Sequence, residues 1–187
     1  ASPKEIRWDI RTRAAPLGAA ENFGAALPLA TADFIALSDQ DDVWVPDKLE
    51  VMSQQLSENP SLVLVHSDAR LIDAAGVPGA SLMSTLRITR GERNTLARGF
   101  AIKALLRRNL VTGATVVLRK ELLDDALPLP QSWVHDEWLG LIAALRGGLA
   151  FNARALIDYR QHGNNQIGAN KTDVAMAQAR LQETRQS

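Results

Sequence analysis

Short apolar runs and amphipathic segments alternate along the chain. Apolar runs at residues 33–38, 62–66 and 114–118 predict buried strands. Helices are expected before and between these runs and after the last of them, at residues 21–30, 45–58, 95–107, 120–126 and 135–146. Strands that alternate with helices are typical of an α/β fold built on one sheet. Nothing within residues 1–187 marks a domain boundary, so the pattern predicts a single domain.

Weaker patterns predict further elements, which are a strand through Ile6, Trp8 and Ile10, a long loop at 74–94, two short strands at 149–152 and 155–159, and an amphipathic tail helix at 169–187. The helix near Pro46 has Leu49, Met52 and Leu56 at helical spacing, and these side chains are expected to face the sheet. Proline suits the first turn of a helix, and the pair Asn59-Pro60 is expected to end this one.

The composition excludes several classes of function. The apolar fraction of 46% and the charged fraction of 22% are those of a globular protein, and 187 residues are enough for one core. The net charge is zero, which gives no general attraction to nucleic acid. There is no cysteine, so disulfides and thiolate zinc sites are excluded. No apolar run approaches the roughly 20 residues that span a bilayer.

The run Asp39-Gln40-Asp41-Asp42 directly follows the apolar residues 34–37. Acidic residues at a strand end lie at the rim of a sheet, where open α/β folds bind their ligands. Crowded carboxylates repel one another, and their oxygen atoms favour Mg²⁺ or Mn²⁺. The run therefore indicates a metal site for a phosphate-bearing substrate, although a solvated acidic turn would produce the same pattern.

The later motifs complete a resemblance that the acidic run begins. They are Asp39-Gln40-Asp41-Asp42-Val43-Trp44-Val45-Pro46-Asp47-Lys48, His66-Ser67-Asp68, Val111-Thr112-Gly113-Ala114-Thr115, His135-Asp136-Glu137-Trp138, and Tyr159-Arg160-Gln161-His162-Gly163-Asn164-Asn165. In this order they resemble family 2 glycosyltransferases of the GT-A fold, over about residues 20–168. Within that family the chain is similar to bacterial rhamnosyltransferase-like members that act in lipopolysaccharide or surface polysaccharide synthesis.

The resemblance implies roles on the side of the sugar donor. It makes Asp41 the ligand of Mg²⁺ or Mn²⁺, and it places Asp39 toward the ribose or a metal-bound water. His162 matches a position that approaches the diphosphate or the metal. Arg160 is suited to bidentate pairing with a phosphate oxygen, and Asp68 lies on the same rim as Asp39, which suits contact with the donor. Each of these residues also has a structural explanation, as a surface cation, a surface histidine or a turn residue.

On the side of the acceptor, the resemblance places the general base at the start of the helix at residue 135. Asp136 is favoured over its neighbour Glu137, although an acidic residue there also serves the helix dipole. Gly113 and Thr115 suit a backbone that passes close to a sugar. Trp138 suits stacking on the acceptor, and a core position explains it equally well.

The resemblance as a whole implies an inverting, metal-dependent transfer from a nucleotide-diphosphate sugar to a glycan or lipid-linked acceptor. It implies a bacterial protein in the cytoplasm, or in peripheral association with the inner face of the plasma membrane. Residues 1–20 match no part of the family's amino-terminal nucleotide-binding unit, so the chain is expected to be a partial domain. The sheet edge left exposed would favour homo-oligomers.

Two other functions are compatible with the acidic run. A haloacid-dehalogenase-type phosphatase would use Asp39 as a nucleophile at the end of the same kind of strand. However, Asp124 and Asp125, its candidate paired acidic motif, lie on a helical segment rather than after a strand. A truncated domain that binds a sugar or a partner without turnover is the third reading.

Overall fold

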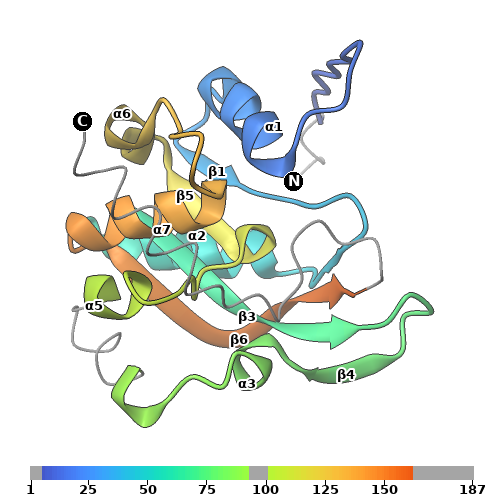
Figure 1. Cartoon of the computed structure of the whole chain (residues 1–187), viewed down its shortest axis with the longest axis vertical. Coiled ribbons are helices and arrows are strands. Elements are labelled where there is room, and N and C mark those ends of the chain that lie inside the picture. The colour runs from blue at the N-terminus through green and yellow to red at the C-terminus, as the bar shows by residue number, and fades with distance from the viewer. Residues whose placement is uncertain (1–5, 93–100, 162–187) are drawn as a thin grey trace.

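The computed structural model describes residues 6–92 and 101–161 of the chain. These residues form a six-stranded mixed sheet in the order β1-β5-β3-β6-β2, with β4 paired to β3 outside this path. The strands are β1 (Phe34–Ala36), β2 (Val43–Trp44), β3 (Leu64–Ile72), β4 (Pro78–Ser81), β5 (Val116–Arg119) and β6 (Leu149–Arg160). The predicted α/β class is confirmed, with strands at all three strongly apolar runs (Figure 1).

The directions of the strands decide which chain segments meet. Strand β5 is antiparallel to both β1 and β3, and β3 is parallel to β6, so β1, β3 and β6 run the same way. The residues that follow β1 and β6 therefore lie at the same end of the sheet as the residues that precede β5. This end of the sheet brings together segments more than 100 residues apart in the sequence.

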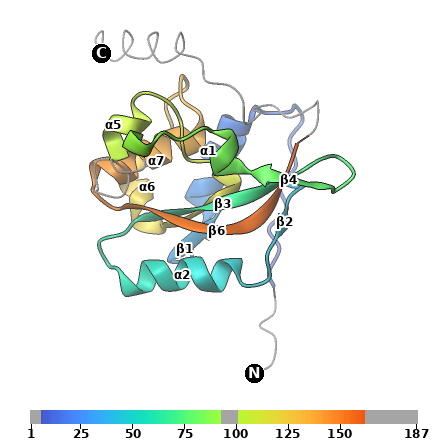
Figure 2. The ribbon, with the colours of Figure 1, turned by 90° about the horizontal axis from the view of Figure 1, so that it is seen from below.

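Helices cover both faces of the sheet. They are α1 (Ala19–Ala26), α2 (Lys48–Glu58), α3 (Leu82–Thr85), α5 (Ala101–Leu105), α6 (Leu123–Ala126) and α7 (His135–Leu145), with 3₁₀ turns at Leu27–Leu29, Gly113–Thr115 and Lys120–Leu122. Figure 2 shows α2 on one face and α1, α5, α6 and α7 on the other. The larger core lies under α5 and α7, and a smaller one lies under α2, built from Met52, Leu56, Val65, Val117 and Leu156.

Helix α2 turns a different face to the sheet from the one that its leucines predict. Leu49 is 49% exposed, whereas Lys48, Met52 and Leu56 are fully buried. A spacing of four residues keeps these three side chains on one face of the helix. The prediction of Leu49 as a core residue was therefore wrong by one position, and a lysine occupies the buried place.

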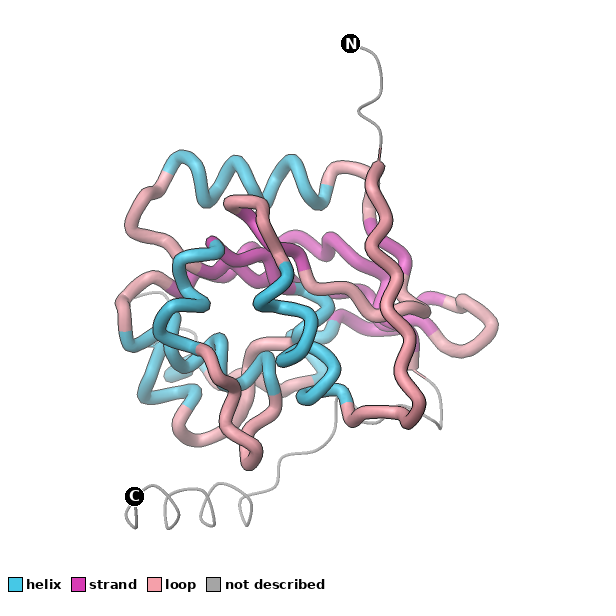
Figure 3. The backbone as a smooth tube through the Cα atoms, turned by 90° about the horizontal axis from the view of Figure 1, so that it is seen from above, coloured by secondary structure: helices cyan, strands magenta, loops and turns pink. Residues whose placement is uncertain are grey.

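Two weaker predictions along the chain were wrong. Residues 6–10 form no strand, and Ile6, Trp8 and Ile10 are all highly exposed, because this segment pairs with no strand of the described sheet (Figure 3). Strand β6 is continuous where two strands were expected. Its register against β3 shifts between Asn152 and Ala155, so the polar interruption is a bulge and not a turn.

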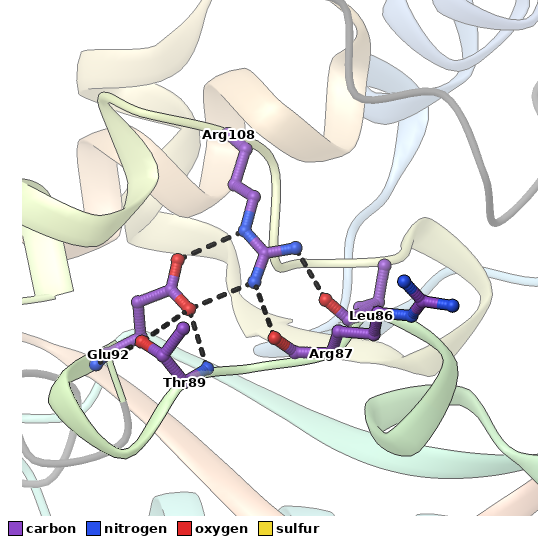
Figure 4. A network of polar contacts seen from close by, with 5 residues as sticks. All are labelled: Leu86, Arg87, Thr89, Glu92 and Arg108. Carbon is purple, nitrogen blue, oxygen red and sulfur yellow. Dashed lines mark hydrogen bonds and ion pairs between the residues drawn. The ribbon is translucent and has the colours of Figure 1, made fainter.

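Residues 74–94, predicted as a long loop, contain β4, α3 and an ordered connection after α3. The connection is held by Arg108, whose guanidinium bonds both carboxylate oxygens of Glu92 and the carbonyl oxygens of Leu86 and Arg87 (Figure 4). Thr89 and Glu92 exchange hydrogen bonds between side chain and backbone in the pattern of a capping box. Of the helix predicted at 95–107, residues 101–107 belong to the described residues, and Ala101–Leu105 form α5; the tail at 169–187 lies outside the described residues.

Candidate active site

The acidic run after β1 lies at the end of the sheet where the strands converge, and most of its carboxylates are poorly solvated. Burial raises the pKa of Asp39 and raises that of Asp42 to about 6. The carboxylates of the run add to both shifts, because each makes the ionisation of the next less favourable. The three carboxylates of the run are therefore half-buried rather than fully exposed to solvent.

Asp42 has one carboxylate oxygen engaged and one without a partner. Its Oδ1 atom accepts the backbone N–H of Arg160 at 2.9 Å, which joins the acidic run to the end of β6. Its Oδ2 atom is buried and has no hydrogen-bond partner among the described residues. An unpaired buried carboxylate oxygen is costly unless a cation or a donor group from a ligand reaches it.

The donor atoms at this rim fit a hard divalent cation in part. The described residues contain no group of three histidine or acidic side chains placed to hold a metal ion. They do supply adjacent carboxylates from Asp39, Asp41 and Asp42, which is the oxygen chemistry that Mg²⁺ and Mn²⁺ prefer. His162, the other predicted ligand, lies outside the described residues. The described rim can therefore supply part of a coordination sphere, and a substrate or water would supply the rest.

Asp136 is enclosed by hydrogen-bond donors at the first turn of α7. Its Oδ2 atom accepts the backbone N–H of Gly113 at 2.8 Å, and its Oδ1 atom accepts from the Glu137 backbone at 2.7 Å and from the Asn109 side chain at 3.1 Å. Burial nevertheless raises the pKa of Asp136 to about 6, since these three bonds only partly replace water. Its carboxylate also adds to the raised pKa of Asp39, so the two predicted groups belong to one electrostatic site.

His135 packs tightly at the same helix start. Its ring stacks on Phe23 with centroids 4.0 Å apart, and a Cβ atom added to Gly113 would lie 2.7 Å from its Nε2 atom. Neither ring nitrogen has a hydrogen-bond partner within the described part of the chain. Burial lowers the pKa of His135 to about 4, and Asp39 acts weakly in the opposite direction. The imidazole is thus neutral at pH 7, and Gly113 must lack a side chain to leave room for it.

Arg160 and Asp68, both predicted to contact the donor, make contacts within the protein. The Arg160 guanidinium donates to the carbonyl oxygens of Asp41, Asp73 and Ala74 at 2.9 to 3.2 Å. The Oδ1 atom of Asp68 accepts the backbone N–H groups of Ala69 and Met83. Arg160 therefore fastens the acidic run to the loop after β3, and Asp68 fixes the start of α3.

Thr115 and Trp138, both predicted to contact the acceptor, also have their polar groups engaged. Thr115 is fully buried, and its hydroxyl donates to the Thr112 carbonyl at 2.7 Å. The indole N–H of Trp138 donates to the Ala126 carbonyl at 2.8 Å, and its ring lies 5.4 Å from that of Trp133. Both residues hold the local structure beside Gly113 and Asp136.

Three residues of the site were not singled out from the sequence. Besides His135, they are Lys48, which is buried beneath the acidic run, and Tyr159, whose phenol lies in the field of the four carboxylates Asp39, Asp41, Asp42 and Asp136. Burial raises the pKa of Tyr159, and these carboxylates raise it further, so its hydroxyl stays neutral. It is the only tyrosine in the chain, but nothing in its sequence context shows that it faces acids.

Together these features define an α/β protein with a carboxylate site at the rim of a mixed sheet. The model of the family Glycosyl transferase family 2 matches residues 1–122, which is more than half of the chain. The chain belongs to this family. The matched range includes residues 1–20, in which the comparison of motifs found no counterpart.

Solved structures share the fold of this chain. Glucosyl-3-phosphoglycerate synthase from Mycobacterium tuberculosis in complex with phosphoglyceric acid is similar with a TM-score of 0.53 and 16% identity, over 89% of this chain and 56% of that chain. The same synthase in complex with Mn²⁺, uridine-diphosphate-glucose and phosphoglyceric acid has a TM-score of 0.52, over 88% and 55%. At this identity the likeness shows the GT-A fold.

Two mycobacterial proteins are similar in sequence. The uncharacterized proteins Rv1520 of Mycobacterium tuberculosis and Mb1547 of Mycobacterium bovis are each 25% identical over 152 residues, which is 79% of this chain and 40% of theirs. The chain thus spans less than half the length of these relatives and just over half that of the synthase. No helix within residues 6–92 and 101–161 has the length and apolar character needed to cross a membrane.

Proposed function

We propose that the chain belongs to a metal-dependent, inverting glycosyltransferase that moves a sugar from a nucleotide-diphosphate donor to an acceptor hydroxyl. The observation that carries this proposal is the place of Asp136. Its side chain is half-buried, its carboxylate is oriented by three hydrogen-bond donors, and it belongs to the same electrostatic site as the acidic run after β1. The reaction needs two parts, which are a base beside the acceptor hydroxyl and a phosphate-binding rim beside the donor.

We assign Asp136 as the general base. In an inverting transfer the acceptor oxygen bonds to the anomeric carbon while the bond from that carbon to the diphosphate oxygen breaks. The proton of the acceptor hydroxyl passes to the carboxylate of Asp136. With a pKa of about 6, this carboxylate is ionised at neutral pH and is a stronger base than an ordinary aspartate. The donors Gly113 and Asn109 hold its two oxygens in place for this step.

We assign Asp41 and His162 to a Mg²⁺ or Mn²⁺ ion, and the Oδ2 atom of Asp42, which is unpaired among the described residues, is a further oxygen available to it. A bound cation would neutralise charge on the departing diphosphate. Asp39 is the proposed contact to the donor ribose, and Asp68 and Arg160 shape the wall around the donor. The synthase of the same fold with bound Mn²⁺ and uridine-diphosphate-glucose supports this assignment by analogy.

On the acceptor side we assign Gly113, Thr115 and Trp138 to the wall beside the base. Thr115 acts by shaping the turn, since it is fully buried. From the motifs we further propose rhamnose as the sugar, and a glycan or lipid-linked acceptor of surface polysaccharide or lipopolysaccharide synthesis. Work on such an acceptor would take place in the cytoplasm or at the inner face of the plasma membrane.

The free edge of β1 supports a further proposal about assembly. In the described part of the chain, β1 pairs with β5 alone, and its other edge has no strand beside it. A second copy could pair there, which would give a homo-oligomer. Light scattering of the purified chain tests this, and a monomer at all concentrations would argue against it.

The proposed function is tested by a transfer assay with nucleotide-diphosphate rhamnose and uridine-diphosphate-glucose, with Mn²⁺, Mg²⁺ or a chelator. Asp136→Asn is expected to lower turnover by about 10²- to 10⁴-fold while binding of the donor persists. Glu137→Gln, the matched change at the competing carboxylate, is expected to keep turnover within a few-fold. If Glu137→Gln abolishes transfer and Asp136→Asn does not, the two roles are reversed.

Metal binding has its own test. Asp41→Asn is expected to weaken Mn²⁺ binding, followed by electron paramagnetic resonance of the free ion, by at least about tenfold. Asp33→Asn, an exposed carboxylate before β1, is the control. Binding of Mn²⁺ and donor by the wild-type protein with no transfer to any acceptor would support the reading of a binding domain without turnover.

A further inference from the structure

Lys48 occupies a position where a core side chain would be expected. It begins α2, and it is fully buried on the same face as Met52 and Leu56. Its ammonium donates a hydrogen bond of 2.7 Å to the carbonyl oxygen of Ala114 and lies 4.0 Å from the centre of the Trp44 ring. A lysine is rarely fully buried unless its charge is paired or used.

The charge of Lys48 is costly where it lies. Burial lowers the pKa of its ammonium to about 8, while the negative charges of Asp42 and Asp39 act in the opposite direction. A methionine would fill the same space without this cost, and replacing buried charges by apolar groups is often neutral or stabilising. Packing under α2 therefore does not explain the lysine, whereas its one hydrogen bond to a carbonyl does point to a role.

The carbonyl that Lys48 holds belongs to the turn that orients Asp136. Ala114 is the middle residue of the 3₁₀ turn Gly113–Thr115, and all three residues of the turn are buried. The turn is stiff, because the Thr115 backbone and hydroxyl both donate to the Thr112 carbonyl. One residue before Ala114, the Gly113 N–H donates to Asp136. A shift of the Ala114 carbonyl is therefore passed to the Gly113 amide.

The turn lies between the two layers of helices. Lys48 reaches it from α2 on one face of the sheet, and Asp136 reaches it from α7 on the other face (Figure 2). Only β2 and residues 45–47 separate the acidic run from α2, so Lys48 lies close in sequence to the proposed metal ligand.

We propose that Lys48 is a positioning residue, which holds the Ala114 carbonyl and thereby sets the Gly113 amide against the Asp136 carboxylate. The inference rests on the proposed role of Asp136 as base, and it adds a link between the donor side and the acceptor side of the site. Lys48 touches neither substrate. It fixes where the base stands relative to the acidic run.

The test compares Lys48→Met with wild type and with Lys120→Met, the same change at an exposed lysine. Lys48→Met removes the donor and the charge but keeps most of the length of the side chain and its unbranched shape. It is expected to lower kcat by about 10- to 100-fold, since small misplacements of a catalytic group have effects of this size, with KM for the donor changed less than about twofold. Lys120→Met is expected to match wild type.

A second measurement does not depend on turnover. Nuclear magnetic resonance of ¹³C-labelled aspartate and of the Gly113 amide follows the Asp136 carboxyl directly in each variant. In Lys48→Met the titration midpoint of Asp136 is expected to move to higher pH, because its hydrogen bond from Gly113 loosens. The other titratable groups around Asp136 are His135 and Glu137 on α7, Asp39 after β1 and Tyr159 on β6, and all are unchanged in this comparison.

The outcomes separate this inference from the proposed function. An unchanged Gly113 amide shift and an unchanged Asp136 midpoint in folded Lys48→Met would overturn the positioning role, whatever happens to turnover. Absence of transfer by wild type would reject the proposed function and leave the resonance test valid. If Lys48→Met does not fold, Lys48→Gln takes its place, since its shorter, uncharged side chain also cannot hold the Ala114 carbonyl. A loss of kcat equal at every pH, with Asp136 unmoved, would show a merely structural role.

Discussion

Relative to wild type, the Asp136→Asn variant should gain stability as the pH rises. The ordinary pKa of an aspartate carboxyl is 3.8, and burial raises that of Asp136 to about 6 in the folded protein. A carboxyl with a raised pKa favours folding while it is protonated. Its contribution is fully present below pH 3.8 and is lost as the pH rises through about 6. The asparagine variant has no such loss, because its side chain does not ionise.

The size of the effect follows from the two pKa values. A shift of about 2 units corresponds to about 3 kcal/mol in the limit, and about 2 kcal/mol of it falls between about pH 4 and about pH 8. A second contribution is independent of pH. The amide of asparagine accepts hydrogen bonds at only one atom, so one of the donors Gly113, Asn109 and Glu137 loses its acceptor, at a cost of about 1–3 kcal/mol. The variant can therefore start below wild type at low pH and approach or pass it at high pH.

Urea unfolding at a series of pH values, with a chelator present, measures the difference in the free energy of unfolding. The difference, variant minus wild type, should rise by about 2 kcal/mol from about pH 4 to about pH 8. Shifts at His66, His135 and Asp42 cancel, because both proteins contain them. Asp124→Asn on α6 controls for the same change at an exposed position. A difference that is flat across this range would refute the assignment of a raised pKa to Asp136.

Two further substitutions test a close contact beside Asp136 and an ion pair in the connection after α3. Gly113→Ala places a Cβ atom 2.7 Å from the Nε2 atom of His135, so we expect urea titration to show a loss of about 1–3 kcal/mol in the free energy of unfolding. Gly18→Ala, whose added Cβ atom would have nothing within 4 Å, should change this free energy little. Equal effects of the two substitutions would contradict the close approach. Glu92→Gln breaks the ion pair with Arg108 and should cost about 1 kcal/mol at neutral pH. Arg108 lowers the pKa of Glu92 to about 2, so this stabilisation is present above about pH 4.5 and is lost as the pH falls toward 2. Thermal melts at both ends of this range test the prediction. An equal loss of stability in Glu92→Gln at both ends would contradict it.

Local patterns predicted the three apolar strands and the place of the acidic run at a strand end well, because both depend on a few neighbouring residues. The apolar runs 33–38 and 62–66 are followed within two residues by Asp39 and Asp68, and a strand with such an end has few alternatives in an α/β chain. The gathering of Asp39 and Asp136 was predicted only through the order of motifs. The sequence alone does not give the distance between these two residues, because the strand order of the sheet brings them together.

The contacts of the site were less predictable, because they depend on the phase of helices and on neighbours far along the chain. Leu49 is more apolar than Lys48, so the hydrophobic pattern placed the wrong residue in the core. Likewise, Ile6, Trp8 and Ile10 alternate as a strand does, but a strand also needs a partner, which a pattern within five residues cannot reveal. Arg160 has the chemistry of a phosphate ligand, and its bonds to backbone carbonyls could only be seen in three dimensions.

The carboxylates at the rim differ from the structural carboxylate of Glu92, and this difference indicates that the rim serves a function. Arg108 lowers the pKa of Glu92, so the charge of Glu92 stabilises the fold, as expected of a structural ion pair. Asp42 and Asp136 have raised pKa values, and Lys48 has a lowered one, so burial opposes the charge of all three at the rim. Selection for stability alone would remove such groups, since apolar or amide side chains would fit with less cost. Their presence together, at the rim where β1, β5, β6 and α7 meet, favours a site kept for binding and proton transfer over a structural explanation.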